Sequence, residues 1–251
     1  EIYAGRGFWP GLCSDFKHNS KFASFVLVSK GSYQHELNIT YPFSLVAFKA
    51  EQEPIHIIPA YWFLFNMFAI ARNNYKFKKR DKRVQKVQHI ETDPLAPDAM
   101  QEVLVALDRL ILLTRDYLKK ISEENVLSAR TEQEELQAAK DYLHQNTEAD
   151  FTLFDLQAQK KYGATIFKPV KAYKEYRKIL KYFAARPLIE YCKSNGYEKF
   201  SRGVLEKIEK ISLFTEWTNA GGQIIPTIKI NQLCEKIKSG QINSWNEIHS
   251  Y

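Results

Sequence analysis

The stretch Phe22-Ala-Ser-Phe-Val-Leu-Val28 decides the expected fold of the N-terminal part of this 251-residue chain. Phe22 and Val28 lie six residues apart, and Phe16 extends the same spacing backwards. A large apolar residue at position one of each step, with a small or β-branched residue at position five, is typical of the hexapeptide repeat of a left-handed β-helix. The position-five residues, including a further step that begins at Pro10, are Ser14, Ser20, Val26 and Ser32.

Outward from this stretch, the pattern changes twice along the chain. Residues 37–48 are rich in β-branched and aromatic residues, so we predict β-structure over residues 1–48 as the end of a β-helix. Residues 59–72 are apolar on nearly all sides, which predicts a buried connecting helix with Pro59 in its first turn. A basic linker follows, so residues 49–90 are expected to join the β-rich start to a helical domain over residues 91–251.

From Pro97 onward, apolar residues recur at three- and four-residue steps, as in Met100, Val103, Leu104 and Leu107. Helix starts are predicted where a Ser or Thr is followed three residues later by an acidic residue. These pairs are Thr131 with Glu134, Thr152 with Asp155, and Ser244 with Glu247. The predicted fold class is therefore α+β and mainly α, with a short β-rich start followed by an irregular helical bundle.

Composition limits the classes of protein that need to be considered. Hydrophobic residues make up 45% of the chain, which is enough for a folded core. The longest apolar stretch, residues 55–71, is shorter than the ~20 residues that a membrane-spanning helix needs. The three cysteines, Cys13, Cys192 and Cys234, are far apart and form no metal-binding spacing. We therefore expect a cytoplasmic protein with free thiols and no membrane partner.

Charge is distributed unevenly along the sequence. Residues 72–86 hold eight basic residues and one acidic residue, whereas residues 91–150 hold 14 acidic and six basic residues. We expect the basic segment to dock against the acidic region, because opposite charges that lie close in sequence can pair within the fold. Binding of nucleic acid or of a membrane surface by the basic segment is the alternative interpretation.

Five stretches of the sequence resemble the C-terminal region of a family of large uncharacterised bacterial proteins. The N-terminal part of that family is similar to hexapeptide-repeat transferases, so the resemblance implies a β-helix that leads into a helical region. It transfers no established activity. The stretches are Tyr3-Ala-Gly-Arg-Gly-Phe-Trp-Pro-Gly-Leu-Cys13, Lys17-His-Asn-Ser20 together with Phe22-Ala-Ser24, Pro59-Ala-Tyr-Trp-Phe-Leu-Phe65, Arg80-Asp-Lys-Arg83 and the run from Gly221-Gly-Gln223 to Ser239-Gly-Gln-Ile-Asn-Ser-Trp-Asn-Glu-Ile-His249.

His18 is the candidate catalytic residue, because a histidine on such a β-helix can act as general base toward a sugar hydroxyl or an amine. Asp15 could orient its imidazole, and Lys17 and Asn19 could contribute to binding. The alternative for His18 is an exposed histidine in a turn.

Two further groups are candidates for binding. Asn66, Arg72 and Asn73 could share one face of the apolar helix, where a ligand or the backbone of a neighbouring element would satisfy the Asn66 amide. The alternating His89, Glu91 and Asp93 could hold a metal ion in an extended segment, but capping and solvation explain them more simply. We therefore assign no metal site, and the cofactor remains unknown.

Three hypotheses of function follow. In the first, this region assists the binding or transfer of a sugar or nucleotide-sugar. In the second, it is a non-catalytic module for homo-oligomerisation or for scaffolding. In the third, its basic segments bind nucleic acid. The sequence does not decide whether the protein is an enzyme, because no complete catalytic constellation is present.

Overall fold

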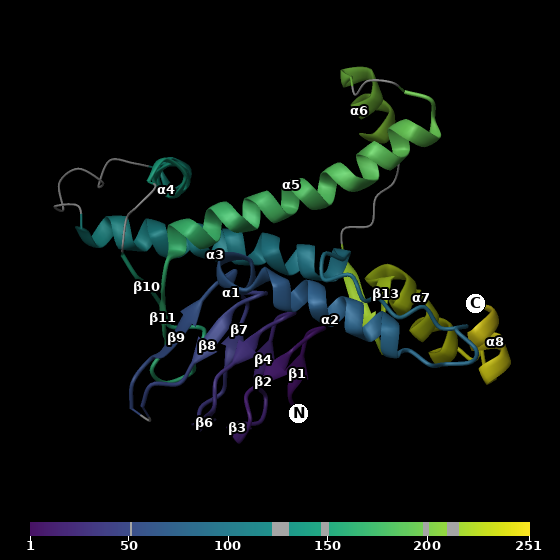
Figure 1. Cartoon of the computed structure of the whole chain (residues 1–251), viewed down its shortest axis with the longest axis horizontal. Helices are drawn as coiled ribbons and strands as arrows, with labels where there is room; N and C mark the ends of the chain where they lie inside the picture. Colours follow the sequence, from purple (N-terminus) through teal and green to yellow (C-terminus); the bar gives the residue numbers. More distant parts are fainter. Residues whose placement is uncertain (51, 122–130, 147–150, 198–200, 210–215) are drawn as a thin grey trace.

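A computed structural model describes residues 1–50, 52–121, 131–146, 151–197, 201–209 and 216–251. Its N-terminal part consists of short strands connected by tight turns (Figure 1). The strands are β1 (Tyr3–Ala4), β2 (Trp9–Pro10), β3 (Ser14–Phe16), β4 (Lys21–Phe22), β5 (Leu27–Val28), β6 (Gly31–Tyr33), β7 (Asn38–Ile39), β8 (Leu45–Ala47) and β9 (Ile55–Ile58).

Most of these strands pair in parallel with the strand three places further along the chain. Tyr3 of β1 lies opposite Lys21 of β4, and Trp9 of β2 lies opposite Leu27 of β5. Pairing of this kind continues from β4 to β7, from β5 to β8 and from β3 to β6. The predicted β-structure over residues 1–48 is therefore present, and its apolar side chains, such as Val26 and Val28, are fully buried.

The prediction that this region is the end of a left-handed β-helix is wrong, because its sheets are mixed. The largest sheet has the order β10-β11-β9-β8-β5-β2. In it β9 runs antiparallel to β8 and parallel to β11, while β10 (Leu153–Asp155) and β11 (Ala164–Ile166) are antiparallel. Ile55 and Ile57 alternate inward on β9, so the chain gains buried contacts by turning back along β8.

The helical body also differs from the predicted bundle. It contains β10 and β11 and a hairpin of β12 (Trp217–Ala220) and β13 (Gln223–Pro226), so the overall class is α/β and not mainly α. The helices are α1 (Tyr61–Phe65), α2 (Met67–Arg80), α3 (Pro97–Ile121), α4 (Glu132–Gln145), α5 (Pro169–Ser194), α6 (Arg202–Glu209), α7 (Thr227–Lys238) and α8 (Trp245–Ser250).

Local helix signals in the sequence had mixed outcomes. The capping boxes of Thr131 with Glu134 and of Ser244 with Glu247 are both formed, at the starts of α4 and α8. Thr152 and Asp155 do not start a helix, because residues 153–155 form β10. Asp155 is buried there, and its carboxylate accepts hydrogen bonds from Tyr41 and Arg109. Tertiary pairing of this aspartate thus overrides its local tendency to cap a helix.

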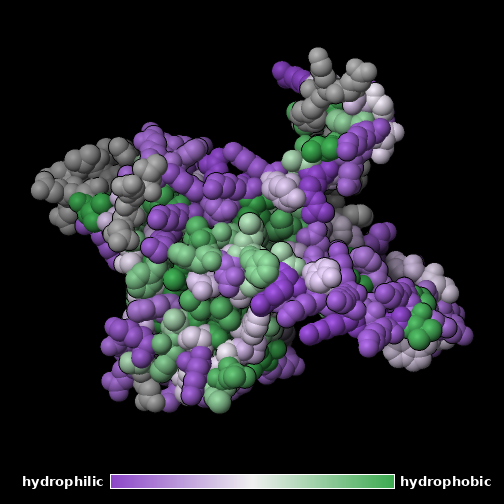
Figure 2. All heavy atoms as spheres, viewed as in Figure 1, coloured by the Kyte–Doolittle hydropathy of each residue, from purple (hydrophilic) through white to green (hydrophobic). Residues whose placement is uncertain are grey.

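The predicted connecting helix is divided at Asn66 into α1 and α2. Trp62, Ala69 and Ile70 are buried, but Phe65 and Phe68 are 54% and 73% exposed, so one side of these helices faces solvent. Figure 2 shows hydrophobic residues gathered on this face, where α1 and the start of α2 lie. No helix of the described residues has both the length and the apolar character needed to cross a membrane.

The long helices α3 and α5 lie across the β-rich part and cover it (Figure 1). Tyr176 of α5 is fully buried, and its hydroxyl donates to the Pro42 carbonyl at 2.6 Å and accepts from the Ala60 N–H at 3.2 Å. This tyrosine therefore links α5 to two loops of the β-rich part. A single core runs through both parts of the chain.

We predict that Trp62→Ala costs about 3–5 kcal/mol of the free energy of unfolding, as for other buried aromatic side chains. Trp62 is 6% exposed, and its Nε1–H donates to the Phe25 carbonyl at 2.8 Å. Urea unfolding followed by circular dichroism measures the loss. The control is Trp245→Ala, since Trp245 is 76% exposed. Equal effects of the two substitutions would contradict the assignment.

Candidate ligand-binding site

Two glycines determine where Arg6 lies. A Cβ atom on Gly5 would approach the Ser24 backbone nitrogen to 2.5 Å, and a Cβ on Gly7 would meet the Phe25 ring at 2.4 Å. Gly7 also has a φ of +70°, which favours glycine. The Arg6 carbonyl accepts a hydrogen bond from the Phe25 N–H at 2.7 Å. The chain on either side of Arg6 is thus pressed against the next turn of the β-rich part.

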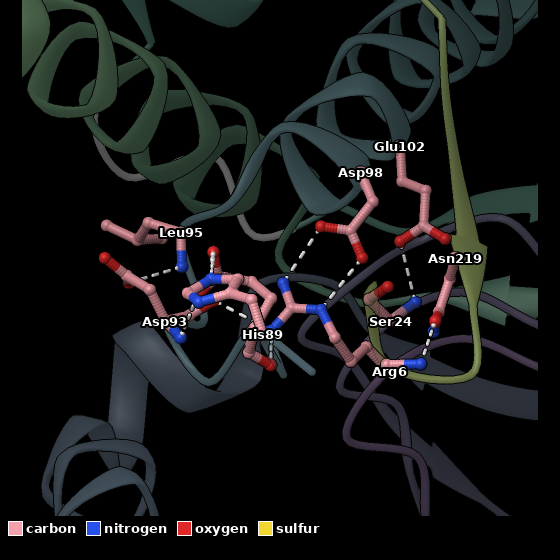
Figure 3. Close-up of polar contacts among 10 residues, drawn as sticks. Arg6, Ser24, His89, Asp93, Leu95, Asp98, Glu102 and Asn219 are labelled. Carbon is pink, nitrogen blue, oxygen red and sulfur yellow. Dashed lines mark hydrogen bonds and ion pairs between the residues drawn. The ribbon is translucent and has the colours of Figure 1, made fainter. Parts of the chain in front are cut away.

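The Arg6 side chain forms an ion pair that connects distant parts of the sequence (Figure 3). Its Nε and Nη2 donate to the two carboxylate oxygens of Asp98 on α3, both at 2.9 Å. Its Nη1 donates to the Asp93 carbonyl at 2.8 Å, and the guanidinium lies over the Phe25 ring. The Arg6 and Asp98 side chains are only 10% and 9% exposed. Two parallel hydrogen bonds of this kind fix the relative orientation of the two side chains and also pair their charges.

We predict that Asp98→Ala destabilises the fold by about 3–5 kcal/mol, because it leaves the Arg6 charge buried without a partner. The double variant R6M/D98L should recover most of that loss, since no unpaired charge remains. Asp116→Ala is the matched control, because Asp116 on the same helix is half-exposed and pairs with its neighbour Arg115. Chemical unfolding measures all three. A double variant as unstable as Asp98→Ala would argue against this account.

The segment before α3 uses its carboxylates to shape the backbone. Asp93 accepts hydrogen bonds from the Leu95 N–H at 2.9 Å and from Arg186 at 2.8 Å, and Glu91 accepts from the Asp93 N–H at 2.7 Å. His89 is 84% exposed and lies 3.8 Å from Glu91. Among the described residues no group of three or more His, Cys, Asp or Glu could hold a metal ion. This arrangement favours the capping interpretation of the three residues.

An aromatic cavity of about 280 Å³ lies beside Arg6. Its aromatic wall comes from the β-rich part and from both helices of the divided pair, and Trp9 stacks on Trp62 with ring centroids 5.8 Å apart. Asn74 also lines the cavity, and its buried Oδ1 has no hydrogen-bond partner among the described residues. A buried amide oxygen without a partner costs free energy. The cavity is also lined by Phe25, Asn73, Phe77, Ile90 and Thr92.

A wider basic depression of about 750 Å³ shares one wall with the aromatic cavity. Trp9, Asn73, Phe77 and Ile90 line both hollows, so they adjoin one another. The other wall of the depression is mainly basic, with one acidic residue, Asp81. Its basic residues are Arg72, Lys76, Arg80, Lys82 and Arg83.

The ion pairs that the basic segment forms with described residues lie inside the segment. Arg83 donates to Asp81 through two nitrogens, both at 2.9 Å, and Lys86 lies 3.6 Å from the same carboxylate. The hydrogen bond from Arg83 lowers the pKa of Asp81 well below its usual range. Neither pair joins this segment to residues 91–150, so the expected docking against that region stays a prediction.

A third hollow, of about 550 Å³, lies on the other side of the Gly5-Arg6-Gly7 stretch and contains Glu102. One Glu102 carboxylate oxygen accepts the Ser24 N–H at 2.7 Å (Figure 3). Burial raises the pKa of Glu102 to about 7, and the Asp98 carboxylate adds to the rise. The hydrogen bond from Ser24 and the Arg6 charge act in the opposite direction without offsetting the burial.

This pKa predicts how stability depends on pH. A carboxyl whose pKa is higher in the folded state contributes stability that is present below its unfolded pKa and is lost as the pH rises through 7. The difference in unfolding free energy between wild type and Glu102→Gln should therefore change by on the order of 2 kcal/mol between pH 5 and pH 8, with wild type losing more. Urea unfolding at several pH values measures it. Parallel profiles for the two proteins would contradict the prediction.

The structure places the predicted catalytic residues away from these hollows. His18 is exposed, and the Asp15 carboxylate accepts a hydrogen bond from Ser32 at 2.6 Å. Lys17 and Asn19 are exposed in the same turn, where Asn19 has a φ of +65°. None of the four lines a hollow described above. The general-base role of His18 therefore stays a prediction without a neighbouring pocket.

The predicted binding residues are separated by the geometry of α2. Asn73 lines both the aromatic cavity and the basic depression, and Arg72 lines the depression. Asn66 is exposed at the junction of α1 and α2, and it lines neither hollow. Sequence reasoning missed Asn74 and Glu102, although the two glycines that flank Arg6 were a signal for a close approach at this point.

Comparison with known proteins gives a relative of unknown function. The chain is 34% identical, over 257 aligned positions, to an uncharacterised protein of Treponema pallidum (strain Nichols). The alignment covers 99% of this chain and 33% of that protein, so the chain spans about a third of the length of the curated relative it matches. No protein-family profile matches the sequence, and no solved structure matches it. The expected likeness to an uncharacterised protein is confirmed.

Proposed function

We propose that this region binds a ligand of the nucleotide class, with its ring in the aromatic cavity and its phosphates in the basic depression. The observation that carries the proposal is the shared wall of Trp9, Asn73, Phe77 and Ile90, which joins an apolar hollow to a cationic one. A ligand that fits both must have a flat or apolar body and an anionic part at one end. Nucleotides have this combination.

The aromatic cavity is suited to a ring. Its volume of about 280 Å³ lies near the lower end of the ~300–1,000 Å³ usual for small-molecule pockets, so it accepts part of a nucleotide and not the whole. Trp9 and Phe77 offer ring faces for stacking, and the Asn73 and Asn74 amides offer donors and acceptors for a base edge. A ligand donor would satisfy the buried Asn74 Oδ1, which is unpaired among the described residues.

The basic depression is suited to phosphates. Arg72, Lys76 and Arg80 line it from successive turns of α2, and they form no ion pair with another described residue. Arginine can bind phosphate through two parallel hydrogen bonds, and lysine adds a mobile positive charge. A diphosphate would neutralise part of this charge.

The proposal extends to two more specific points. The ligand carries a sugar on its diphosphate, and a longer protein that contains this region transfers that sugar. Their support is the resemblance of this chain to the C-terminal region of a family whose N-terminal part is similar to transferases, which is a likeness and not a site. We also propose a cytoplasmic location. Its support is that Cys13, Cys192 and Cys234 are all free thiols.

A second candidate function is assembly without catalysis. Phe65, Met67 and Phe68 are between 54% and 73% exposed and are consecutive apolar positions around the junction of α1 and α2. Exposed apolar patches on folded proteins often mark interfaces. A homo-oligomer formed through this face would be compatible with an occupied nucleotide pocket.

The proposal predicts measurable binding of UDP, ADP and UDP-N-acetylglucosamine by isothermal titration calorimetry at physiological ionic strength. The double variant R72A/R80A should weaken binding by about tenfold or more, since it removes two phosphate donors. The matched control K78A/K79A removes two charges from the same helix outside the depression and should change affinity by less than about twofold. Asn74→Ala should weaken the binding of the nucleotides but not the binding of inorganic diphosphate.

Three outcomes would overturn the proposal. Equal losses of affinity in R72A/R80A and K78A/K79A would show that binding depends on the overall positive charge of α2 and not on the basic depression. No binding of any nucleotide at millimolar concentration would leave assembly as the better account. Tighter binding of a mixed-sequence RNA oligomer than of nucleotides, weakening steeply with added salt, would favour nucleic acid as the partner.

A further inference from the structure

The Glu102 hollow differs in character from the nucleotide pocket. It is bounded by the β1, β4 and β7 strands on one side and by α3 on the other. Its wall is mainly apolar and includes Ile39 and Val105. Tyr3 of β1 and Lys21 of β4 also line it, and both residues are exposed. Gly5 lines this hollow, whereas Arg6 and Gly7 line the aromatic cavity, so the two sites lie on opposite sides of one short stretch.

Among the described residues no basic side chain forms an ion pair with the Glu102 carboxylate, although Lys21 lines the same hollow. Arg6 is the nearest buried cation, but both of its donor edges are committed to Asp98 and to the Asp93 carbonyl. Lys21 from β4 lies with its Nζ over the Tyr3 ring, 5.8 Å from the centroid, and forms no ion pair with a described residue. The partner of Glu102 is the Ser24 N–H, a neutral donor from the loop after β4.

We infer that this hollow binds an organic ammonium ligand, with the ammonium group against Glu102 and an apolar body against the strands and α3. Glu102 is half-buried beside a mainly apolar wall, where its carboxylate is stabilised either by holding a proton or by gaining a positive partner. A bound ammonium group supplies that partner.

Other ligand chemistries fit the hollow less well. A phosphate or carboxylate ligand would meet the negative charge of Glu102 at short range. A metal ion would find one carboxylate here, and the described residues offer no group of three ligands. A neutral alcohol could accept or donate one hydrogen bond but would leave the carboxylate charge without compensation.

Binding should depend on pH in a direction set by Glu102. The pKa of this carboxyl is about 7, so it is mainly protonated at pH 6 and mainly ionised at pH 8. The other charged or titratable groups near it are Arg6, Asp98, Lys21 and Tyr3, from the N-terminal strands and α3, and Tyr176 from α5. Benzylamine stays cationic over this range, so its affinity should rise by about tenfold from pH 6 to pH 8.

The test uses benzylamine and benzyl alcohol as a matched cationic and neutral pair, followed by ligand-observed NMR on the full chain. Benzylamine should bind at pH 8 at least about tenfold more tightly than benzyl alcohol, and Glu102→Gln should remove both that preference and the pH dependence. Asp108→Asn is the control, because Asp108 is an exposed acid on the same helix. It should leave binding unchanged.

A second measurement keeps the inference testable if Glu102→Gln does not fold. In wild-type protein labelled at the glutamate carboxyl carbons, saturating benzylamine should lower the pKa of Glu102, since the bound cation favours the ionised form. An unchanged Glu102 titration, equal affinity for the alcohol, or an equal loss in Asp108→Asn would overturn the inference. UDP should not compete with benzylamine, so this test stands apart from the nucleotide proposal.

Discussion

The buried ion pair between Arg6 and Asp98 is the interaction on which the arrangement of this protein depends. Arg6 lies in the first turn of the β-rich part, and Asp98 lies in the first turn of α3, 92 residues later. The pair can exist only because Gly5 and Gly7 let the backbone approach Ser24 and Phe25. Neither charge could be buried alone, so the two parts of the chain must dock in one position.

All three hollows are arranged around this pair. The aromatic cavity and the Glu102 hollow flank the Gly5-Arg6-Gly7 stretch, and the basic depression continues the cavity along α2. Because Arg6 is committed to Asp98 and to the Asp93 carbonyl, it forms no ion pair with Glu102. The proposed nucleotide site and the proposed ammonium site thus lie close to the same ion pair.

A second buried network makes the same point at the other end of the core. Asp155 on β10 accepts hydrogen bonds from Tyr41 and Arg109 and from the Gln157 N–H. Burial raises the pKa of Tyr41 well above its ordinary value, and the neighbouring Asp155 carboxylate adds to the rise, so the phenol stays protonated and donates. These contacts hold β10 and β11 against the β-rich part, and they explain why the main sheet includes strands from the middle of the chain.

The sequence by itself determined the features that depend on neighbouring residues. Residues 1–48 have the apolar spacing of β-structure, Thr131 and Ser244 form the predicted capping boxes, and the long helices follow their three- and four-residue apolar steps. Of the candidate site residues that it named, Arg72 and Asn73 line the basic depression, and Asn73 also lines the aromatic cavity. Only the tertiary structure decided the rest. The antiparallel return of β9, the strand identity of Asp155 and the contact of Glu102 with Ser24 depend on partners from about 10 to more than 100 residues away, and no local pattern contains those contacts.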